Sequence, residues 1–237
     1  MDTRVPRLGL IVNPVAGMGG PVALRGTDGK ADQARARGQE PVAHERAVRL
    51  LTRLGFQGEL LTVSGPMGEA ACQEAGRACR VVHEVEAPTT AADTEAAAQA
   101  LRDAGVQLLL FLGGDGTAMD VARAIDHEVP VLGVPSGVKM NSAVFAETPE
   151  AGARVADAFL AGELEVAERE VVEVDEQALD REGLVPVQLA SLMVPVDDAI
   201  QPSKAEPGGS TEGLVEAIEE LALPGAVLVL GPGSTSL

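Results

Sequence analysis

Short apolar segments, each bounded by turn-forming residues, alternate with longer segments of helical periodicity over the first part of the chain. These apolar segments are Leu8–Val12, Glu59–Val63, Arg80–Val85, Val106–Leu112 and Val131–Val134. Strands that are largely apolar and separated by helices are typical of a parallel sheet covered on both faces. Residues 1–147 are therefore predicted to form a doubly wound α/β domain, with its sites at the carboxyl ends of the strands.

The segments between these strands carry helix signals. The predicted helices are Pro41–Leu54, a helix from Ser64 or Gly65 that carries both cysteines, a helix capped by Thr89 or Thr90 that runs to Ala104, Ala118–Ile125 and Pro149–Leu160. Cys72 and Cys79 lie seven positions apart, which predicts that they share one face of their helix. They form no Cys-x-x-Cys motif and no histidine accompanies them, so we expect two small buried thiols in a reducing compartment and no metal site.

The pattern changes after Glu163. Glu165–Glu176 and Leu184–Val196 alternate apolar and polar residues, which favours an antiparallel sheet with one wet face. A helix is predicted at Thr211–Leu223 and a last strand at Gly225–Leu230. Residues 148–237 are thus predicted to form a second, β-rich domain.

The composition excludes several classes of protein. The chain carries a net charge of −18, has no Trp or Tyr and has only four Phe. A nucleic-acid binder needs a basic surface and often aromatic stacking platforms, so no nucleic-acid partner is expected. Such acidity, with only three lysines, fits either adaptation to high salt or an ordinary acidic cytosolic protein. No apolar run approaches the length of a membrane span, and the first is too short for a signal-peptide core, so a cytoplasmic protein without membrane contact is expected.

The strongest functional signal is the string Gly113-Gly114-Asp115-Gly116-Thr117, which follows a buried strand and precedes a helix. Glycines let backbone N–H groups approach a phosphate, and a helix N-terminus adds its positive dipole end. Asp115 can accept the proton of an attacking hydroxyl or hold Mg²⁺ against phosphate oxygens. The alternative is a tight strand–helix turn in which Asp115 only caps the helix.

Three other loops after predicted strands are expected at the same edge of the sheet. They are the glycine loop that begins at Asn13, the segment Pro135–Ser142 with Lys139 and Asn141, and the segment Gly231–Thr235. Lys139 is a candidate phosphate partner, while Asn141 and Ser142 offer neutral hydrogen bonds to a ribose or a phosphate. Neither the Gly-x-x-x-x-Gly-Lys-Ser/Thr loop nor the Gly-x-Gly-x-x-Gly dinucleotide fingerprint occurs.

On these residues the chain resembles the NAD kinase and diacylglycerol kinase superfamily, and within it the archaeal ATP-NAD kinase-like group that includes the AcoX proteins of acetoin-catabolism gene clusters. The matching stretches are Ile11–Gly20, Gly26–Gly29, Gly113–Thr117, Gly137–Met140 with Ser142–Phe145, and Leu230–Thr235. The resemblance implies a Rossmann-like N-terminal domain, a β-rich C-terminal domain and an active site between them.

The resemblance also implies an activity: ATP-dependent transfer of a phosphoryl group to the adenosine ribose 2′-hydroxyl of NAD, with Mg²⁺ bridging the phosphates. Asp115 would be the catalytic residue. The candidate nucleotide-binding residues are Asn13, Gly113, Gly114, Gly116, Thr117, Lys139, Asn141, Gly233, Ser234 and Thr235. No protein side chain is assigned as a dedicated metal ligand. ATP and NAD are the expected ligands, and we expect a homo-oligomer.

Two features leave alternatives open. The Asn-Glu pair with which NAD kinases bind the NAD ribose does not occur here, so a kinase of another small acceptor remains an alternative. The chain also ends soon after Thr235, where members of the group usually continue, so an incomplete second domain and a non-catalytic nucleotide-binding protein are considered. A lipid kinase ranks lower, because an acidic surface is repelled by anionic membranes.

Overall fold

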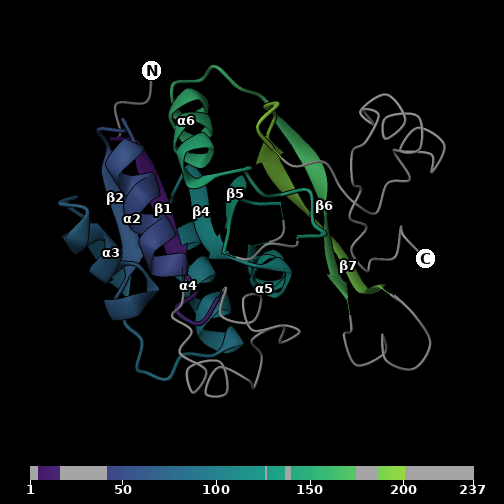
Figure 1. Cartoon of the computed structure of the whole chain (residues 1–237), viewed down its shortest axis with the longest axis horizontal. Helices are drawn as coiled ribbons and strands as arrows, with labels where there is room; N and C mark the ends of the chain where they lie inside the picture. Colours follow the sequence, from purple (N-terminus) through teal and green to yellow (C-terminus); the bar gives the residue numbers. More distant parts are fainter. Residues whose placement is uncertain (1–4, 17–41, 126, 137–139, 175–185, 201–237) are drawn as a thin grey trace, which may run out of the picture. The chain divides into compact units, whose positions relative to one another are not determined.

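The structure is a computed structural model of the whole chain, and it describes residues 5–16, 42–125, 127–136, 140–174 and 186–200 (Figure 1). In chain order the elements are β1 (Arg7–Val12), α2 (Ala43–Arg53), β2 (Glu59–Val63), a short 3-10 helix (Gly65–Met67), α3 (Glu69–Glu74), β3 (Arg80–His83), α4 (Ala91–Asp103), β4 (Leu108–Gly113), α5 (Asp115–Ile125), β5 (Val131–Pro135), α6 (Pro149–Leu160), β6 (Val166–Val174) and β7 (Pro186–Pro195). The elements predicted at 211–223 and 225–230 lie outside the described residues.

Five strands form one parallel sheet in the order β3-β2-β1-β4-β5, which confirms the predicted doubly wound α/β fold. In the register of the central pair, Leu10 lies opposite Leu110 and Val12 opposite Leu112. At the end of the next pair, Gly113 lies opposite Pro135. Every residue of β4 and β5 is buried, as their continuous apolar sequences require.

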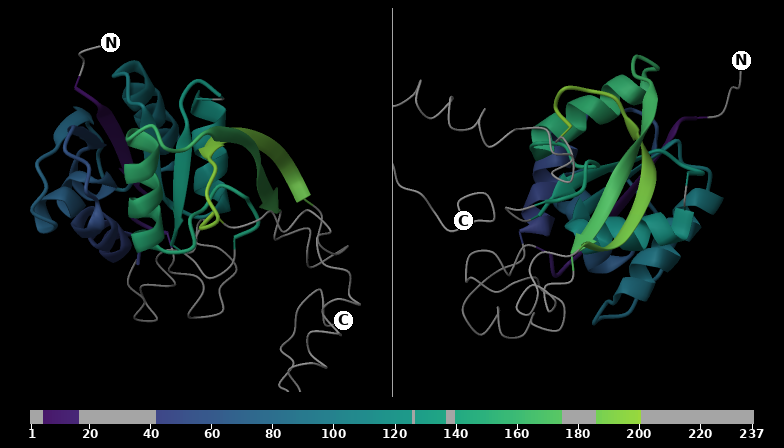
Figure 2. Two further views of the ribbon diagram at one scale, coloured as in Figure 1. Left: turned by 90° about the horizontal axis from the view of Figure 1, so that it is seen from above. Right: turned by 90° about the vertical axis from the view of Figure 1, so that its right-hand side faces the viewer.

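Helices cover both faces of this sheet (Figure 2). Helix α2 packs against α3 and α6 on one face, while α4 and α5 pack together on the other. The chain leaves β1 toward β2 and returns to the other side of β1 with β4. The order of the strands therefore reverses between β1 and β4, and in doubly wound folds ligands bind in the crevice at the carboxyl ends of such a pair.

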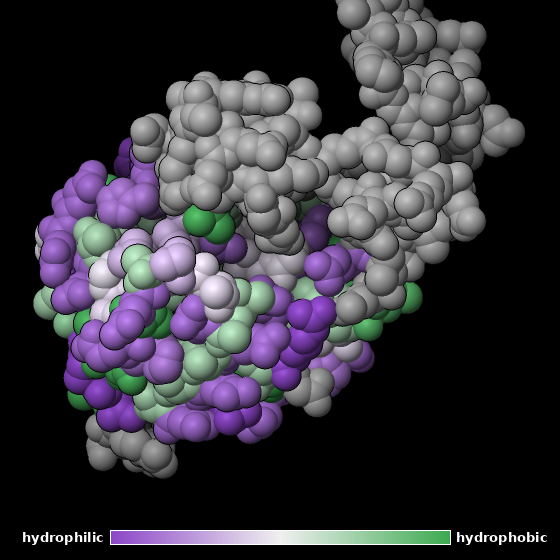
Figure 3. Space-filling model, turned by 90° about the horizontal axis from the view of Figure 1, so that it is seen from below, coloured by the Kyte–Doolittle hydropathy of each residue, from purple (hydrophilic) through white to green (hydrophobic). Residues whose placement is uncertain are grey.

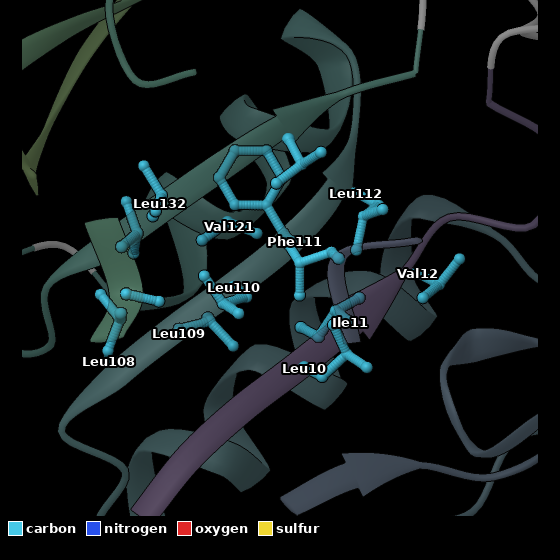
Figure 4. Close-up of a cluster of buried hydrophobic side chains, with 14 of the residues drawn as sticks. Leu10, Ile11, Val12, Leu108, Leu109, Leu110, Phe111, Leu112, Val121 and Leu132 are labelled. Atoms are coloured by element: carbon cyan, nitrogen blue, oxygen red, sulfur yellow. The ribbon is translucent and has the colours of Figure 1, made fainter. Parts of the chain in front are cut away.

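The core is aliphatic, with few aromatic side chains (Figure 4). Side chains of β1 and β4 make up its centre, and Leu10, Leu110 and Leu112 are fully buried. The rings of Phe111 and Phe145 meet edge to face, with their centroids 5.5 Å apart. A Cβ atom on Gly133 would lie 2.6 Å from Phe145 and 2.7 Å from Phe111, so only glycine lets both rings approach β5.

A two-stranded antiparallel sheet, β6–β7, follows the parallel sheet, as the alternating pattern predicted. Leu192 and Val194 of β7 are fully buried, whereas Leu189 is exposed. The segment after β5 connects the two sheets, because Ala143 N donates to Glu170 O of β6 at 3.0 Å. The described residues belong to one compact unit, Met1–Ser203, and the domain boundary at 147/148 stays a prediction.

The helix predicted to carry both cysteines ends too early to do so. Helix α3 stops at Glu74, and Gly76 adopts a left-handed conformation with φ of 66° that terminates it. Cys79 lies beyond the helix, so the prediction of a shared helix face is wrong. Cys72 is fully buried as expected, and burial raises the pKa of its thiol, as does the neighbouring Cys79.

Helix α5 begins at Asp115, three residues before the predicted start at Ala118. Its first intrahelical bond runs from Ala118 N to Gly114 O at 3.0 Å. The residues predicted as loop are thus the first helical turn, where an acidic side chain is favoured by the helix dipole. Among the described residues, no helix is both long and apolar enough to cross a bilayer.

Candidate active site

The carboxyl ends of β1 and β4 are joined by hydrogen bonds from one residue. Asn13, the first residue after β1, donates its backbone N–H to Leu112 O at 2.9 Å. Its side-chain amide donates to Thr117 Oγ1 at 2.9 Å, and its Oδ1 accepts from Val15 N at 3.1 Å. Asn13 thereby holds the loop after β1 against the first turn of α5, across the crevice where the order of the strands reverses.

The three glycines of the Gly113–Thr117 string have different structural needs. At Gly113 a Cβ atom would lie 2.5 Å from Thr117 Cβ, so packing within the protein requires glycine there. A Cβ atom added at Gly114 would meet its nearest atoms 4.0 Å away, on Met140, and one added at Gly116 would meet its nearest 3.8 Å away, on Glu173. Neither residue has the left-handed conformation that favours glycine. A Cβ atom at either position would make ordinary van der Waals contacts, so packing of the described residues does not require glycine there. Glycine at these positions lets a ligand approach the backbone more closely than a side chain would allow.

The first turn of α5 carries backbone donors beside these two glycines. The N–H groups of residues 115–117 precede the first intrahelical hydrogen bond, so they have no acceptor within the helix. Such N–H groups, together with the helix dipole, favour an anion. Figure 3 shows the molecule from the end at which β1 and β4 terminate, and the described surface there mixes hydrophilic residues with small apolar areas.

Asp115 accepts hydrogen bonds from a single segment after β5. Its Oδ1 accepts from Ser142 N at 3.0 Å and from Ser142 Oγ at 2.7 Å. Its Oδ2 accepts from Asn141 N at 2.9 Å and from Asn141 Nδ2 at 3.0 Å. These donors hold the carboxylate in one orientation, half-buried at the start of α5. The same bonds give Asp115 a structural role, since they attach the segment after β5 to the helix.

Ser142 was expected to offer a hydrogen bond to a ribose or a phosphate, and the structure gives it two partners within the protein. It is 1% exposed, and its hydroxyl accepts from Val172 N of β6 at 3.0 Å while donating to Asp115. Ser142 therefore links the start of α5 to the antiparallel sheet. Asn141, the neighbour of Ser142, was a predicted binding residue. The chain has only two asparagines, Asn13 and Asn141, and the side chains of both donate to the Gly113–Thr117 string.

The structure brings together part of the predicted site. Two pairs of predicted residues are hydrogen-bonded: Asn13 with Thr117, and Asn141 with Asp115. The remaining predicted residues, Lys139, Gly233, Ser234 and Thr235, lie outside the described residues. Within the described ranges, His, Cys, Asp and Glu side chains form no group of three or more that could hold a metal ion. Mg²⁺ commonly uses one or two carboxylates and the phosphates of its substrate instead.

Residues 8–164 match the family described as the ATP-NAD kinase N-terminal domain. The matched segment spans β1 to α6, and it contains the whole of the Asn13, Gly113–Thr117 and Asn141 arrangement. The chain belongs to this family. That family consists of ATP-dependent kinases. The resemblance stated from the motifs is thereby confirmed.

Solved structures similar to this kinase-family domain include two described as putative diacylglycerol kinases from Bacillus anthracis str. Sterne. One is 16% identical with a TM-score of 0.38, covering 71% of this chain and 46% of its own. The other is 14% identical with a TM-score of 0.37, covering 72% of this chain and 44% of its own. The kinase-family chain thus spans less than half the length of these structures. No curated protein showed a significant match.

Proposed function

We propose that this chain transfers the γ-phosphoryl group of ATP to the adenosine ribose 2′-hydroxyl of NAD and so forms NADP. The observation that carries the proposal is Asp115, a carboxylate held in one orientation by Asn141 and Ser142 at the N-terminus of α5. It is flanked in the chain by Gly114 and Gly116, where packing does not require glycine. A carboxylate next to phosphate-binding backbone groups suits proton transfer from an attacking hydroxyl.

In the proposed reaction Asp115 accepts the proton of the 2′-hydroxyl, while the oxygen of that hydroxyl forms a bond to the γ-phosphorus. The bond from that phosphorus to the β,γ-bridging oxygen breaks, and ADP leaves. Because the Asp115 oxygens already accept from Asn141 and Ser142, a substrate hydroxyl must replace or share one of these donors. Substrate binding is therefore expected to shift the segment that carries these two residues.

Backbone groups would supply most of the phosphate binding. The N–H groups at the start of α5 can donate to phosphate oxygens, and Thr117 Oγ1 lies beside them with Asn13 as its partner. A bound Mg²⁺ ion would neutralise phosphate charge, and the phosphates themselves would be its principal ligands. Lys139, Gly233, Ser234 and Thr235 remain predicted nucleotide contacts.

The test is a donor and acceptor screen of the full chain. ATP, Mg²⁺ and NAD should give equal amounts of ADP and NADP, and Asp115→Asn should lower the rate by roughly 100-fold or more. Formation of ADP with another acceptor, a lipid such as diacylglycerol included, would keep the kinase class and reject NAD. Nucleotide binding without any ADP formation would show a non-catalytic binding protein.

A further inference from the structure

Arg46 places a positive charge at the edge of the sheet that carries the glycine string. It lies in the first turn of α2, and its Nη1 donates to the carbonyl oxygen of Pro135, the last residue of β5. Pro135 is the register partner of Gly113 at the end of β4. The guanidinium therefore lies beside the start of the Gly113–Thr117 string, on the α2 face of the sheet.

This guanidinium has no carboxylate partner among the ion pairs of the described residues. Arg49, one turn further along α2, forms hydrogen bonds of 2.8 to 3.0 Å with Glu150. Arg46 is half-buried in a chain of net charge −18, and burial lowers its pKa, with a further contribution from the nearby Arg49. A guanidinium has five N–H donors, and one interaction with a carbonyl uses few of them. Glu45 acts in the opposite direction on the pKa of Arg46 as a nearby negative charge, but the two form no ion pair, so donors of the half-buried guanidinium stay available to an anion.

Ser136 adds a second unsatisfied group at the same place. Its side chain is 1% exposed, and its hydroxyl has no hydrogen-bond partner within the described part of the chain. Its backbone N–H donates to Gly113 O at 2.8 Å, so it also lies at the carboxyl end of β4 and β5. Buried hydroxyls are usually hydrogen-bonded, and an exception calls for a partner such as a ligand.

The two residues meet at one peptide group. Arg46 Nη1 donates to the carbonyl oxygen of Pro135, which belongs to the same peptide unit as the backbone N–H of Ser136. Ser136 follows the end of β5 in a bend. A Cβ atom on Gly152 of α6 would lie 3.0 Å from Val134 Cγ2 and 3.5 Å from Leu50 Cδ1, so Val134 faces α2 and α6. Arg46 lies one helical turn before Leu50, in the direction of the carboxyl edge.

We propose that Arg46 and Ser136 form an anion subsite at the carboxyl end of β5 that binds a phosphate group of a nucleotide. That the phosphate belongs to a nucleotide rests on the proposed function. That the site binds an anion rests on Arg46 and Ser136 alone. A guanidinium binds two phosphate oxygens at once, and the Ser136 hydroxyl can donate to a third. The phosphate would then be contacted by Arg46 from the α2 face and by the backbone donors of α5 from the opposite face.

The test is calorimetry of the full chain with inorganic pyrophosphate, ATP and NAD as separate probes. Arg46→Gln should weaken pyrophosphate binding roughly tenfold to a hundredfold, and Ser136→Ala roughly threefold to tenfold. Arg46→Lys should retain part of the affinity, because it keeps the charge but not the planar donors. Arg49→Gln, on the same helix but paired with Glu150, is the matched control and should bind as the wild type does.

Thermal unfolding separates this role from a structural one. Ser136→Ala removes a hydroxyl that is unsatisfied without a ligand, so the melting temperature of the free protein should stay the same or rise. Arg46→Gln also loses the hydrogen bond to Pro135 O, so it should lower the melting temperature modestly at most. A lower melting temperature together with unchanged pyrophosphate binding would overturn the inference. The comparison of ATP with NAD identifies the source of the phosphate, since only the ligand that uses the subsite should lose affinity in Arg46→Gln.

The outcomes also separate this inference from the proposed function. If Arg46→Gln leaves the KM for ATP and the KM for NAD unchanged, the subsite is rejected and the proposed function still stands. Pyrophosphate binding that depends on Arg46 in a protein that forms no ADP would reject the function and support the subsite. A wild-type chain that binds none of the three probes would overturn the subsite as well.

Discussion

The hydroxyl of Ser142 donates a hydrogen bond of 2.7 Å to Oδ1 of Asp115, across 27 positions of the sequence. The same hydroxyl accepts from Val172 N at 3.0 Å. A single buried oxygen atom thus orients the proposed catalytic carboxylate and connects it to β6. The active-site segment and the antiparallel sheet are therefore expected to respond together when this atom is removed.

Ser142→Ala tests that connection. The substitution leaves Val172 N without its partner and Asp115 with fewer donors, so the free energy of unfolding should fall by about 1–3 kcal/mol. Kinase activity should fall as well, because the carboxylate loses part of its orientation. Urea denaturation measures the first effect. Ser191→Ala is the control: this hydroxyl of β7 bonds the exposed side chains of Glu168 and His127, so its loss should cost about 1 kcal/mol or less. Equal stability losses in the two variants would contradict the role of Ser142.

The glycines of the string should separate folding from ligand binding. Gly113→Ala forces a methyl group against Thr117, whose branched side chain cannot easily move, so we expect a destabilisation of about 1–3 kcal/mol. Gly116→Ala places a methyl group in a helical turn at an ordinary contact distance, 3.8 Å from the nearest atom of Glu173, so it should leave stability unchanged or raise it by up to about 1 kcal/mol. Its methyl group would nevertheless occupy the space assigned to the ligand, so ATP affinity should fall.

Thermal melting and ATP titration of the two glycine variants measure these effects. A Gly116→Ala protein that is stable and binds ATP like the wild type would show that the ligand does not approach the backbone there.

Asn13→Asp changes charge with little change of shape. The Thr117 hydroxyl can rotate to donate to the new carboxylate, so the loop after β1 should stay attached to α5. The added negative charge beside the proposed phosphate position should weaken ATP binding by roughly tenfold. Titration at low and high salt checks the cause, because screening should reduce the difference between variant and wild type. A difference that does not respond to salt would point to altered loop structure instead.

The capping box at the start of α4 predicts a pH dependence of stability. Hydrogen bonds from Thr90, first from its side chain and then from its backbone N–H, lower the pKa of Asp93 below its ordinary value. A carboxyl whose pKa is lower in the folded state stabilises the fold above its unfolded pKa, about 3.9, and loses that contribution as the pH falls through the folded value.

Asp93→Asn should therefore be less stable than the wild type near neutral pH, and the difference should shrink as the pH falls below about 4 and through the lower pKa of the folded state. Urea denaturation across this range measures the difference. A gap that persists at low pH would mean that the ionised carboxylate is not its origin.

Local patterns in the sequence were sufficient for most of the elements. The apolar runs and their glycine and proline boundaries predicted β2 and α6 at their observed residues. In α6, Pro149 suits the first turn and Thr148 Oγ1 accepts from Ala151 N at 3.1 Å, so the start of the helix is encoded within four residues. Such signals act between near neighbours in the chain, and so they can be read from a single sequence.

The tertiary structure decided what these elements do together. Asn13 reaches Thr117 across 104 positions, and Arg46 reaches Pro135 across 89. These pairs depend on strand order, on register and on the helices that cover each face, which no local period records. The sequence could indicate that Asp115 follows a buried strand, but its donors and the position of the nearby Arg46 guanidinium are set by packing. The physical reason is that secondary structure forms from local contacts, whereas this site consists of side chains brought together by long-range folding of the sheet.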